Sequence, residues 1–430
     1  MLSRWIIWFF AALFYFYEYV LRISPSVMVH ELMASFHGAA TGIGILSAFF
    51  LYAYAPMQLP VGLLIDRYGI RRLLPLAALL CGAGSLLFSL SPTLTLAAGG
   101  RFLIGLGSAF AFVAMVYISS HRFNMKKRAL LIGVANSIAM LGASFGGGPL
   151  SSVVSALGWR EAMCLLGIFG FGLAFLIFRT AAEDDEKPKV EPIGKSLRAV
   201  FFHPPSWING LVAICIYITT TAFAGLWGAS FIETAYSVSP TVASYAMSMV
   251  FLGWLVGGPL IGYFAGKTGR PLLLIRIFTL LLALTLSIVL YVEMLPLEMV
   301  FLLTFLIGLF SSAELLNFTI AIELAPPFAR ATALAFTNFI VSLGDGGAQS
   351  LVGFLLDMRW TGGLRDGLRF YSASDYRAAL TFLPVMLIFG AILSLFVLPR
   401  YHRRPKSENR KSSPLPVPEF GGARSSNRVG

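Results

Sequence analysis

Charged residues and cysteines are scarce in this sequence. Asp, Glu, Lys and Arg make up 12% of the 430 residues, about half the share in a soluble domain, while hydrophobic residues make up 57%. A soluble chain of this size could not bury so much apolar surface, so a soluble fold is excluded. The three cysteines, Cys81, Cys164 and Cys215, all lie in apolar segments. This placement excludes a disulfide framework and predicts that they are packing residues.

The motifs of common catalytic sites are absent from the sequence as well. It has no Walker loop, no His-Glu-x-x-His and no Ser, His and Asp at a recognisable spacing. We therefore expect neither an enzyme nor a metal site or cofactor. The net charge of +12 could indicate nucleic-acid binding, but the basic residues flank apolar runs. We interpret them as a topology signal and expect no nucleic-acid partner.

Long apolar runs, in contrast, are abundant. Most are long enough to cross about 30 Å of hydrocarbon as helices. The first begins at Trp5, has no signal-peptide cleavage site and is expected to remain as a helix. The expected spans are 5–29, 41–65, 73–90, 94–119, 129–153, 161–178, 206–232, 241–265, 272–292, 298–324, 332–356 and 379–398.

The distribution of Lys and Arg predicts how the chain is oriented. With a cytoplasmic N-terminus, the external basic residues are Arg160, Arg359, Arg365, Arg369 and Arg377, five of the 32 Lys and Arg. The opposite orientation would invert this bias, so we expect both termini in the cytoplasm. The short loops favour a bacterial inner membrane. The segment 357–378 is the only sizeable external loop, and the sequence assigns it no role.

A polar stretch, 179–205, divides the spans six and six and is predicted to be a cytoplasmic linker. The six-helix bundles are then expected at 1–178 and 206–398, with a basic disordered tail at 399–430.

Several positions of the first bundle recur about 200 residues later in the second. Such a duplication predicts an all-α membrane protein whose twelve transmembrane helices form two six-helix pseudo-repeat bundles around a central cavity. The recurring pairs are Gly62 and Gly262, Gly69 and Gly269, Gly105 and Gly308, Asn136 and Asn338, and Gly142 and Gly344.

The stretch 60–72, Pro-Val-Gly-Leu-Leu-Ile-Asp-Arg-Tyr-Gly-Ile-Arg-Arg, joins the second and third expected spans. Its glycines would let backbones turn or approach closely. Its spacing resembles the loop motif between helices 2 and 3 of the major facilitator superfamily. The resemblance implies a transporter in which this motif and its weaker repeat latch one conformation. The gating residues would be Gly62, Asp66, Arg67, Gly69, Arg71, Arg72, Gly262, Gly269 and Arg270.

Further motifs extend the resemblance over most of the membrane part. Arg101-x3-Gly105-x-Gly107 resembles the helix-4 motif of the family, in which the arginine is linked to proton coupling. Gly142-x3-Gly146 begins a stretch similar to the helix-5 motif of exchangers, but Pro149 is displaced, so antiport is not inferred. The Tyr-Glu-x-x-Leu-Arg element at 17–22 resembles bacterial phagosomal amino-acid transporters and, more loosely, lysosomal dipeptide transporters.

Ionisable residues inside the spans are functional candidates, because each costs about 2.5–3.5 kcal/mol to insert at the bilayer centre. Glu18 and Arg22 stand at i, i+4 on one helix face with Tyr15, where they can pair. The alternative is an ion pair that only anchors the first span. Arg101 needs an acid or an anionic ligand, and a structural role is equally compatible with its sequence context.

A second polar face is expected on the eleventh span. Asn338, Ser342, Asp345 and Gln349 follow one another at steps of four, three and four, so they share a face directed at a cavity or a partner helix. Glu314 and Asn317 add polar groups to the tenth span at i, i+3. Asn136 occupies the position in the fifth span that Asn338 occupies in the eleventh. Paired asparagines can also serve only to join helices.

We expect a secondary transporter that moves a small polar organic solute by alternating access. A mixed acid and base cavity favours amino acids or short peptides, with coupling to protons. Efflux of drugs or siderophores is the alternative if the cavity is mainly aromatic and apolar, and a transporter-like solute sensor is a third possibility. We expect a monomer in the lipid bilayer. Substrate and proton handling is assigned to Glu18, Arg22, Arg101, Glu314 and Asp345, and weaker cavity contacts to Tyr15, Asn136, Asn317, Asn338 and Gln349.

Overall fold

The computed structural model describes residues 2–123, 125–180, 193–365 and 367–396. Within these ranges, twelve helical spans are long and apolar enough to cross a membrane, as predicted. The protein is a multi-pass integral membrane protein. The predicted tail at 399–430 and residues 181–192 of the predicted linker lie outside the described residues.

The helices of the first half are nearly continuous from Leu2 to Thr180. They are α1 (Leu2–Ile23), α2 (Val29–Phe36), α3 (Ala40–Met57), α4 (Val61–Tyr68), α5 (Ile70–Leu90), α6 (Leu94–Arg122), α7 (Met125–Gly146), α8 (Gly148–Leu157) and α9 (Trp159–Thr180). A 3-10 turn, Ser24–Val27, follows α1.

The second half has the same number of spans and more irregular segments. It consists of α10 (Ile193–Phe201), α11 (Pro204–Ile218), a π-helical segment (Thr219–Trp227), α12 (Gly228–Tyr236), α13 (Pro240–Thr268), α14 (Pro271–Tyr291), α15 (Leu297–Ser311), a 3-10 turn (Ser312–Glu314), α16 (Leu315–Leu324), a 3-10 turn (Pro327–Ala329), α17 (Arg330–Arg359), β1 (Leu364–Arg365), β2 (Leu368–Arg369), α18 (Ala373–Leu380) and α19 (Phe382–Leu393).

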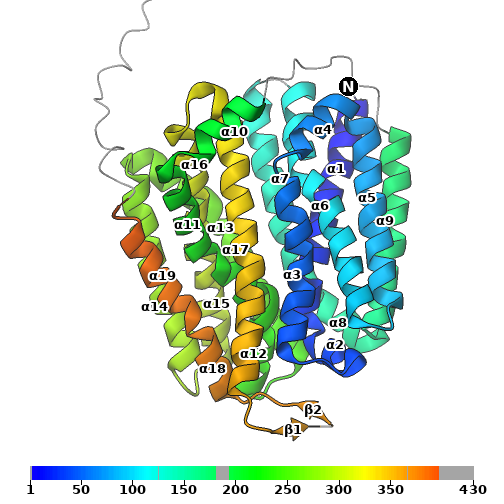
Figure 1. Cartoon of the computed structure of the whole chain (residues 1–430), viewed down its shortest axis with the longest axis vertical. Helices are drawn as coiled ribbons and strands as arrows, with labels where there is room; N and C mark the ends of the chain where they lie inside the picture. The colour runs from blue at the N-terminus through cyan, green and yellow to red at the C-terminus, as the bar shows by residue number, and fades with distance from the viewer. Residues whose placement is uncertain (1, 124, 181–192, 366, 397–430) are drawn as a thin grey trace, which may run out of the picture.

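The two halves lie side by side (Figure 1). Helix α3 packs on α17, and α7 and α8 pack on α13, so each half contributes to two seams. The end of the molecule that carries α4 and α10 is called the α4 end below. The opposite end carries α2, α18 and the antiparallel β1–β2 hairpin, and is called the hairpin end.

Packing reproduces the sequence repeat. A Cβ placed on Gly105 in α6 would collide with the carbonyl oxygen of Phe50 in α3, and one on Gly308 in α15 would collide with that of Val250 in α13. The two glycines were paired by the repeat, and Phe50 and Val250 are also 200 residues apart. Glycine is required at both positions because two backbones touch there.

Two predicted spans differ more than the others from the helices of the structure. The second, expected at 41–65, ends as α3 at Met57, and α4 begins only at Val61. Pro60 has no backbone N–H to continue the helix through this turn. The twelfth, expected to begin at 379, begins at Ala373, because Ser372 and Asp375 form a capping box. The first turn of this helix is polar, so a search for apolar runs placed the start of the span too late.

Other departures are local. The expected linker contains the helix α10, and the expected all-α fold includes the short hairpin, which lies in the loop that the sequence left without a role. Span 7 contains the nine-residue π-helix Thr219–Trp227, and span 10 is interrupted by the 3-10 turn that ends at Glu314. Helix interruptions of both kinds are frequent at functional sites.

Candidate functional site

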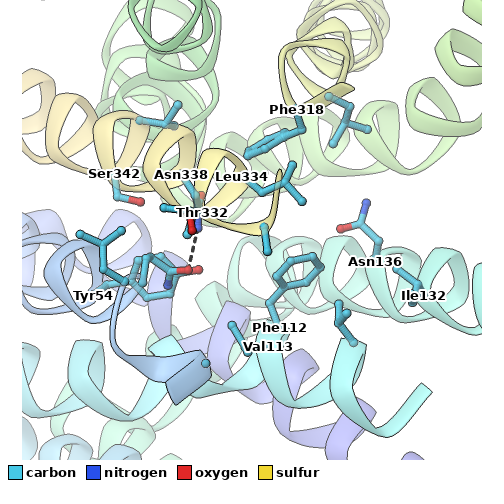
Figure 2. A pocket seen from close by; sticks show the side chains of 18 of the residues that line it. Tyr54, Phe112, Val113, Ile132, Asn136, Phe318, Thr332, Leu334, Asn338 and Ser342 are labelled. Atoms are coloured by element: carbon cyan, nitrogen blue, oxygen red, sulfur yellow. Dashed lines mark hydrogen bonds between the residues drawn. The ribbon is translucent and has the colours of Figure 1, made fainter. Parts of the chain in front are cut away.

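A cavity of about 800 Å³ lies between the two halves. Its wall includes Arg22 from the first half and Glu314 from the second. Gly62, Ser196 and Phe328 line it toward the α4 end. Figure 2 shows side chains from both halves around it, with residues of α6 and α7 facing residues of α16 and α17. The predicted central cavity is thus present and is built by both bundles.

Arg22 presents the cationic group of the cavity wall. It comes from the last turn of α1, and its Nε and Nη2 donate hydrogen bonds to Oε1 of Glu18, at 2.9 and 2.5 Å. The predicted i, i+4 pair is therefore confirmed. Glu18 is fully buried, whereas the side chain of Arg22 is 11% exposed, and of the two only Arg22 is among the described lining residues. Its Nη1 takes no part in this pair.

Aromatic rings frame the Arg22 guanidinium. The Cζ atom of Arg22 lies 4.7 Å from the ring centre of Tyr19 and 4.5 Å from that of Tyr54. Tyr15, a predicted contact, lines the cavity and packs edge-on against Tyr19. Cation–π contacts stabilise the guanidinium without adding a negative charge, and Glu18 is its hydrogen-bonded acidic partner.

Arg101 acts on the backbone of α1 rather than on the cavity. It is 1% exposed and is not among the described lining residues. Its Nη1 donates to the carbonyl oxygen of Leu21 at 2.7 Å and its Nη2 to that of Arg22 at 3.3 Å. These carbonyls belong to the last turn of α1, where carbonyl groups lack helical partners. The hydrogen-bond partners of Arg101 are thus backbone carbonyls rather than an acid, and its assignment to substrate and proton handling stays a prediction.

Glu314 is the acid of the opposite wall. It ends the 3-10 turn in span 10, is 2% exposed and lines the cavity. The turn brings its side chain to the cavity at the junction of α15 and α16. Asn317, predicted as a cavity contact, instead joins helices: its Nδ2 donates to the carbonyl of Glu314, and its own carbonyl accepts from Asn209.

The predicted polar face of α17 divides into two parts. Asn338 and Ser342 line the cavity, whereas Asp345 and Gln349 contact the π-helix and are not among the lining residues described. Thr221 donates a 2.9 Å hydrogen bond to Oδ1 of Asp345 and accepts one from Gln349 at its carbonyl. Glu314 and Asp345 are close enough for their charges to interact, as are Asp345 and Arg22.

Gln58 and Asn338 connect the halves at the cavity wall. Nδ2 of Asn338 donates to Oε1 of Gln58 at 2.9 Å, and both residues line the cavity. Asn136 lines it from α7 (Figure 2). Sequence reasoning missed Gln58 as a cavity residue, although Tyr54 stands four positions before it on the same helical face, and it missed the π-helix, for which no sequence signal was available.

The predicted gating stretch forms a turn at Gly69, whose φ of +77° favours glycine. Gly269 does the same in the repeat, with φ of +62°. Gly62 and Gly262, however, have no atom within 4 Å of an added Cβ, so no backbone approaches closely at either glycine in this conformation. The two glycines lie at open surfaces, and Gly62 borders the cavity.

The arginines of this stretch and of its repeat lie close in sequence to the two turns at Gly69 and Gly269. Arg67, Arg72 and Arg270 are exposed, and Arg71 is partly buried. The side chain of Asp66 lies outside the described residues. Its gating role therefore stays a prediction.

Among the described residues, no three His, Cys, Asp or Glu side chains are grouped as metal ligands. The described residues that line the cavity offer one guanidinium, one carboxyl group, several amides and several hydroxyl groups on opposing walls. Such a wall can bind a small solute that carries a charge at one end and hydrogen-bonding groups elsewhere.

Comparison with known families gives a match over most of the chain. The family described as the Major Facilitator Superfamily matches residues 4–345 and 210–429.

Individual relatives are more distant. A protein of Cupriavidus necator named a probable sulfoacetate transporter is 27% identical over 38% of each chain. A probable L-galactonate transporter of Escherichia coli is 26% identical over 58% of this chain and 59% of its own. The membrane sensor protein UhpC of Salmonella typhimurium is 22% identical over 61% of this chain and 63% of its own. The chain thus spans less than two thirds of the length of these relatives.

A solved structure shares the fold. A bacterial homologue of the human lysosomal transporter Spinster, in an inward-facing and occupied conformation, superimposes with a TM-score of 0.74 at 18% identity. The match covers 91% of this chain and 96% of the other.

Proposed function

This chain belongs to the Major Facilitator Superfamily, and we propose that it is a secondary transporter that binds the anionic group of a small organic solute at Arg22. The observation that carries the proposal is the position of Arg22 in the wall of the cavity, framed by Tyr19 and Tyr54 and paired through only part of its guanidinium. A carboxylate or sulfonate would bind the remaining donor, and charge-assisted hydrogen bonds of this kind are strong in a desolvated site.

The relatives support an organic acid as the substrate. Two of them are named for sulfoacetate and L-galactonate, both of which carry an anionic group. The amides of Gln58 and Asn338 and the hydroxyl group of Ser342 lie in the same cavity wall and suit the rest of a hydroxylated acid.

Glu314 favours a zwitterion as a second candidate. It lies in the half opposite to Arg22, so an amino acid or short peptide would place its carboxylate on Arg22 and its amine on Glu314. The predicted preference for amino acids or peptides rests on this opposition of charges. In either case, Glu314 and the nearby Asp345 are the acids that we assign to proton coupling.

An apolar lining favours the efflux alternative. Toward the α4 end the wall is formed by side chains such as Val116, Ile132, Met140, Phe318 and Leu334. A drug-like substrate would use this part of the cavity and would not require Arg22. The sensor alternative gains support from the similarity to UhpC. A sensor would bind its ligand without exchanging it across the membrane.

We also propose that the chain acts as a monomer in a bacterial inner membrane, with both termini in the cytoplasm. The two bundles would form substrate pathways in turn at the two ends of the molecule. The stretch 60–72 would then latch the α4 end when that end closes.

Counterflow in proteoliposomes tests these alternatives. Vesicles would be preloaded with organic acids, amino acids, dipeptides, neutral sugars or a cationic drug, and uptake of the same labelled solute would be followed with and without a pH step. We expect counterflow of an organic acid or a zwitterion. Counterflow of a neutral sugar or of the drug alone would contradict the assignment of Arg22, and binding without exchange would favour the sensor.

A further inference from the structure

Asp357 joins the two halves at the hairpin end. It lies in the last turn of α17, and its Oδ2 accepts hydrogen bonds from the backbone N–H of Thr41, at 2.8 Å, and from the Thr41 hydroxyl group. Its Oδ1 accepts from Arg369 at 3.0 Å and from the hydroxyl group of Tyr371. Tyr371 in turn accepts from the backbone N–H of Ala40 at 3.2 Å. Both oxygens of one carboxylate are thus occupied.

These bonds cap a helix of the other half. The first N–H groups of α3 have no helical acceptor, and Ala39 at its N-cap has no side chain that could accept them. Asp357 and Tyr371 supply the missing acceptors from across the seam. The negative charge of Asp357 also lies at the positive end of the α3 dipole, which strengthens the contact.

At the equivalent seam, between α8 and α13, the start of the helix is not capped by a charged residue of the other half. Helix α13 corresponds to α3 in the repeat, and its own Ser239 caps it by accepting from the N–H of Val242. Ser239 stands 200 residues after Ala39. Ser155, the counterpart of Asp357 in α8, makes only an exposed contact of 3.3 Å with the hydroxyl group of Thr241. At the hairpin end, the α3–α17 seam therefore carries a charged cap, whereas the equivalent positions of the other seam carry the Ser155–Thr241 hydroxyl contact. Further along that other seam, Ser248 of α13 accepts from the N–H of Gly148 and donates to the carbonyl oxygen of Ser144.

Two hydrogen-bond partners of Asp357 come from its own half of the molecule. Arg369 and Tyr371 belong to the same half as Asp357 and can stay bound to it when α3 moves away. Burial and the adjacent carboxylate raise the pKa of Tyr371, so its hydroxyl group stays protonated and continues to donate. Only the bonds to Ala40 and Thr41 would break.

We propose that Asp357, with Tyr371, is a latch that closes the hairpin end through the α3–α17 seam. Opening of this end requires α3 to part from α17 and exposes the uncapped N–H groups of α3. The segment 357–378, left without a role by the sequence, thereby controls which end of the cavity is open. The latch rests on the proposed alternating access, but its operation does not depend on the identity of the substrate.

Distances between spin labels test the latch. Ala34 and Met294 are exposed and belong to different halves. Ala34 lies in α2 at the hairpin end, and Met294 follows Glu293, which pairs with Arg377 of α18 at the same end. Cysteines at both positions, in the full chain with its native cysteines replaced and reconstituted in nanodiscs, would report the opening by double electron–electron resonance. Asp357→Ala removes the acceptors for Thr41, and Thr41→Val removes one donor but keeps the backbone N–H.

We expect Asp357→Ala to raise the ratio of long to short distances at least about tenfold, because hydrogen bonds to a charged group are lost on one side of the equilibrium. Thr41→Val should give a smaller rise. The matched control, Ser155→Ala with Thr241→Val in the other seam, should change the ratio less than about twofold.

Unchanged distances in Asp357→Ala, or an equal rise in the control, would overturn the latch. A fall in melting temperature without a change in distances would assign Asp357 a purely structural role and would overturn it as well. If Asp357→Ala does not fold, Asp357→Asn and Tyr371→Phe provide the same comparison. Failure of counterflow would refute the proposed transport and leave these distances interpretable, so the two proposals fail separately.

Discussion

Neutralising the Glu18–Arg22 pair is the sharpest perturbation of the proposed anion site. Removing Arg22 alone would leave the fully buried Glu18 without its partner, a loss that costs about 3–5 kcal/mol of stability. The double variant Glu18→Gln/Arg22→Gln removes both charges and keeps two side chains that can hydrogen-bond at i, i+4. Its melting temperature should stay close to that of the wild type.

The expected loss of affinity follows from the number of donors that Arg22 can offer. Its Nε and Nη2 already bind Glu18, so a substrate anion gains at least one charge-assisted hydrogen bond from the remaining nitrogen. Such a bond contributes about 1.5–3 kcal/mol. At about 1.4 kcal/mol for each factor of ten, the Kd should rise roughly tenfold to a hundredfold.

Glu18→Gln alone should act in the opposite direction. It frees Arg22 from its competitor, so the Kd for an anion should stay the same or fall. Equilibrium binding to the purified variants in nanodiscs measures both effects, with a neutral analogue of the substrate as the control. A double variant that binds the anion within about twofold of the wild type would refute the anion site, and so would equal losses in the single and the double variant.

Further expectations follow from the same structure. Glu314→Gln should preserve exchange of the substrate at equal pH and abolish its accumulation driven by a pH gradient, and accumulation at the wild-type level would exclude Glu314 from coupling. Asp66→Asn should reach the membrane in normal amount but show slow net uptake, so normal uptake would remove the latch at 60–72. Tyr371→Phe should increase opening of the hairpin end to the same extent from about pH 6 to 9, because the raised pKa keeps the phenol protonated well above that range. An effect that varies across this range would contradict the donor role of Tyr371.

Features that follow from local spacing could be predicted from the sequence. The Glu18–Arg22 pair requires only an α-helix, and the turns at Gly69 and Gly269 require only glycine at positive φ. The twelve spans could be predicted from the lengths of the apolar runs. A segment that crosses a bilayer has to satisfy its backbone hydrogen bonds internally, so a long apolar run predicts a helix. The recurrence of Gly105 and Gly308 predicted a repeat that the packing reproduces.

Features that depend on contacts between distant segments could not be predicted from the sequence. The division of the α17 face between Asn338 and Asp345 depends on where the π-helix of span 7 lies. Arg101 carries a charge that suggested a ligand, yet its partners are backbone carbonyls, which a sequence does not mark. Asp357 stands at the start of a loop to which the sequence assigned no role. Its proposed role depends on the contact with Thr41, which is 316 residues away in the sequence.

The most direct measurement of the central claim is counterflow by the wild type and by Glu18→Gln/Arg22→Gln in matched proteoliposomes. We expect the wild type to exchange a labelled organic acid or zwitterion across the membrane. The variant, equally folded, should lose that exchange at substrate concentrations near the wild-type Kd. Exchange that is equally fast in both proteins would contradict the central claim.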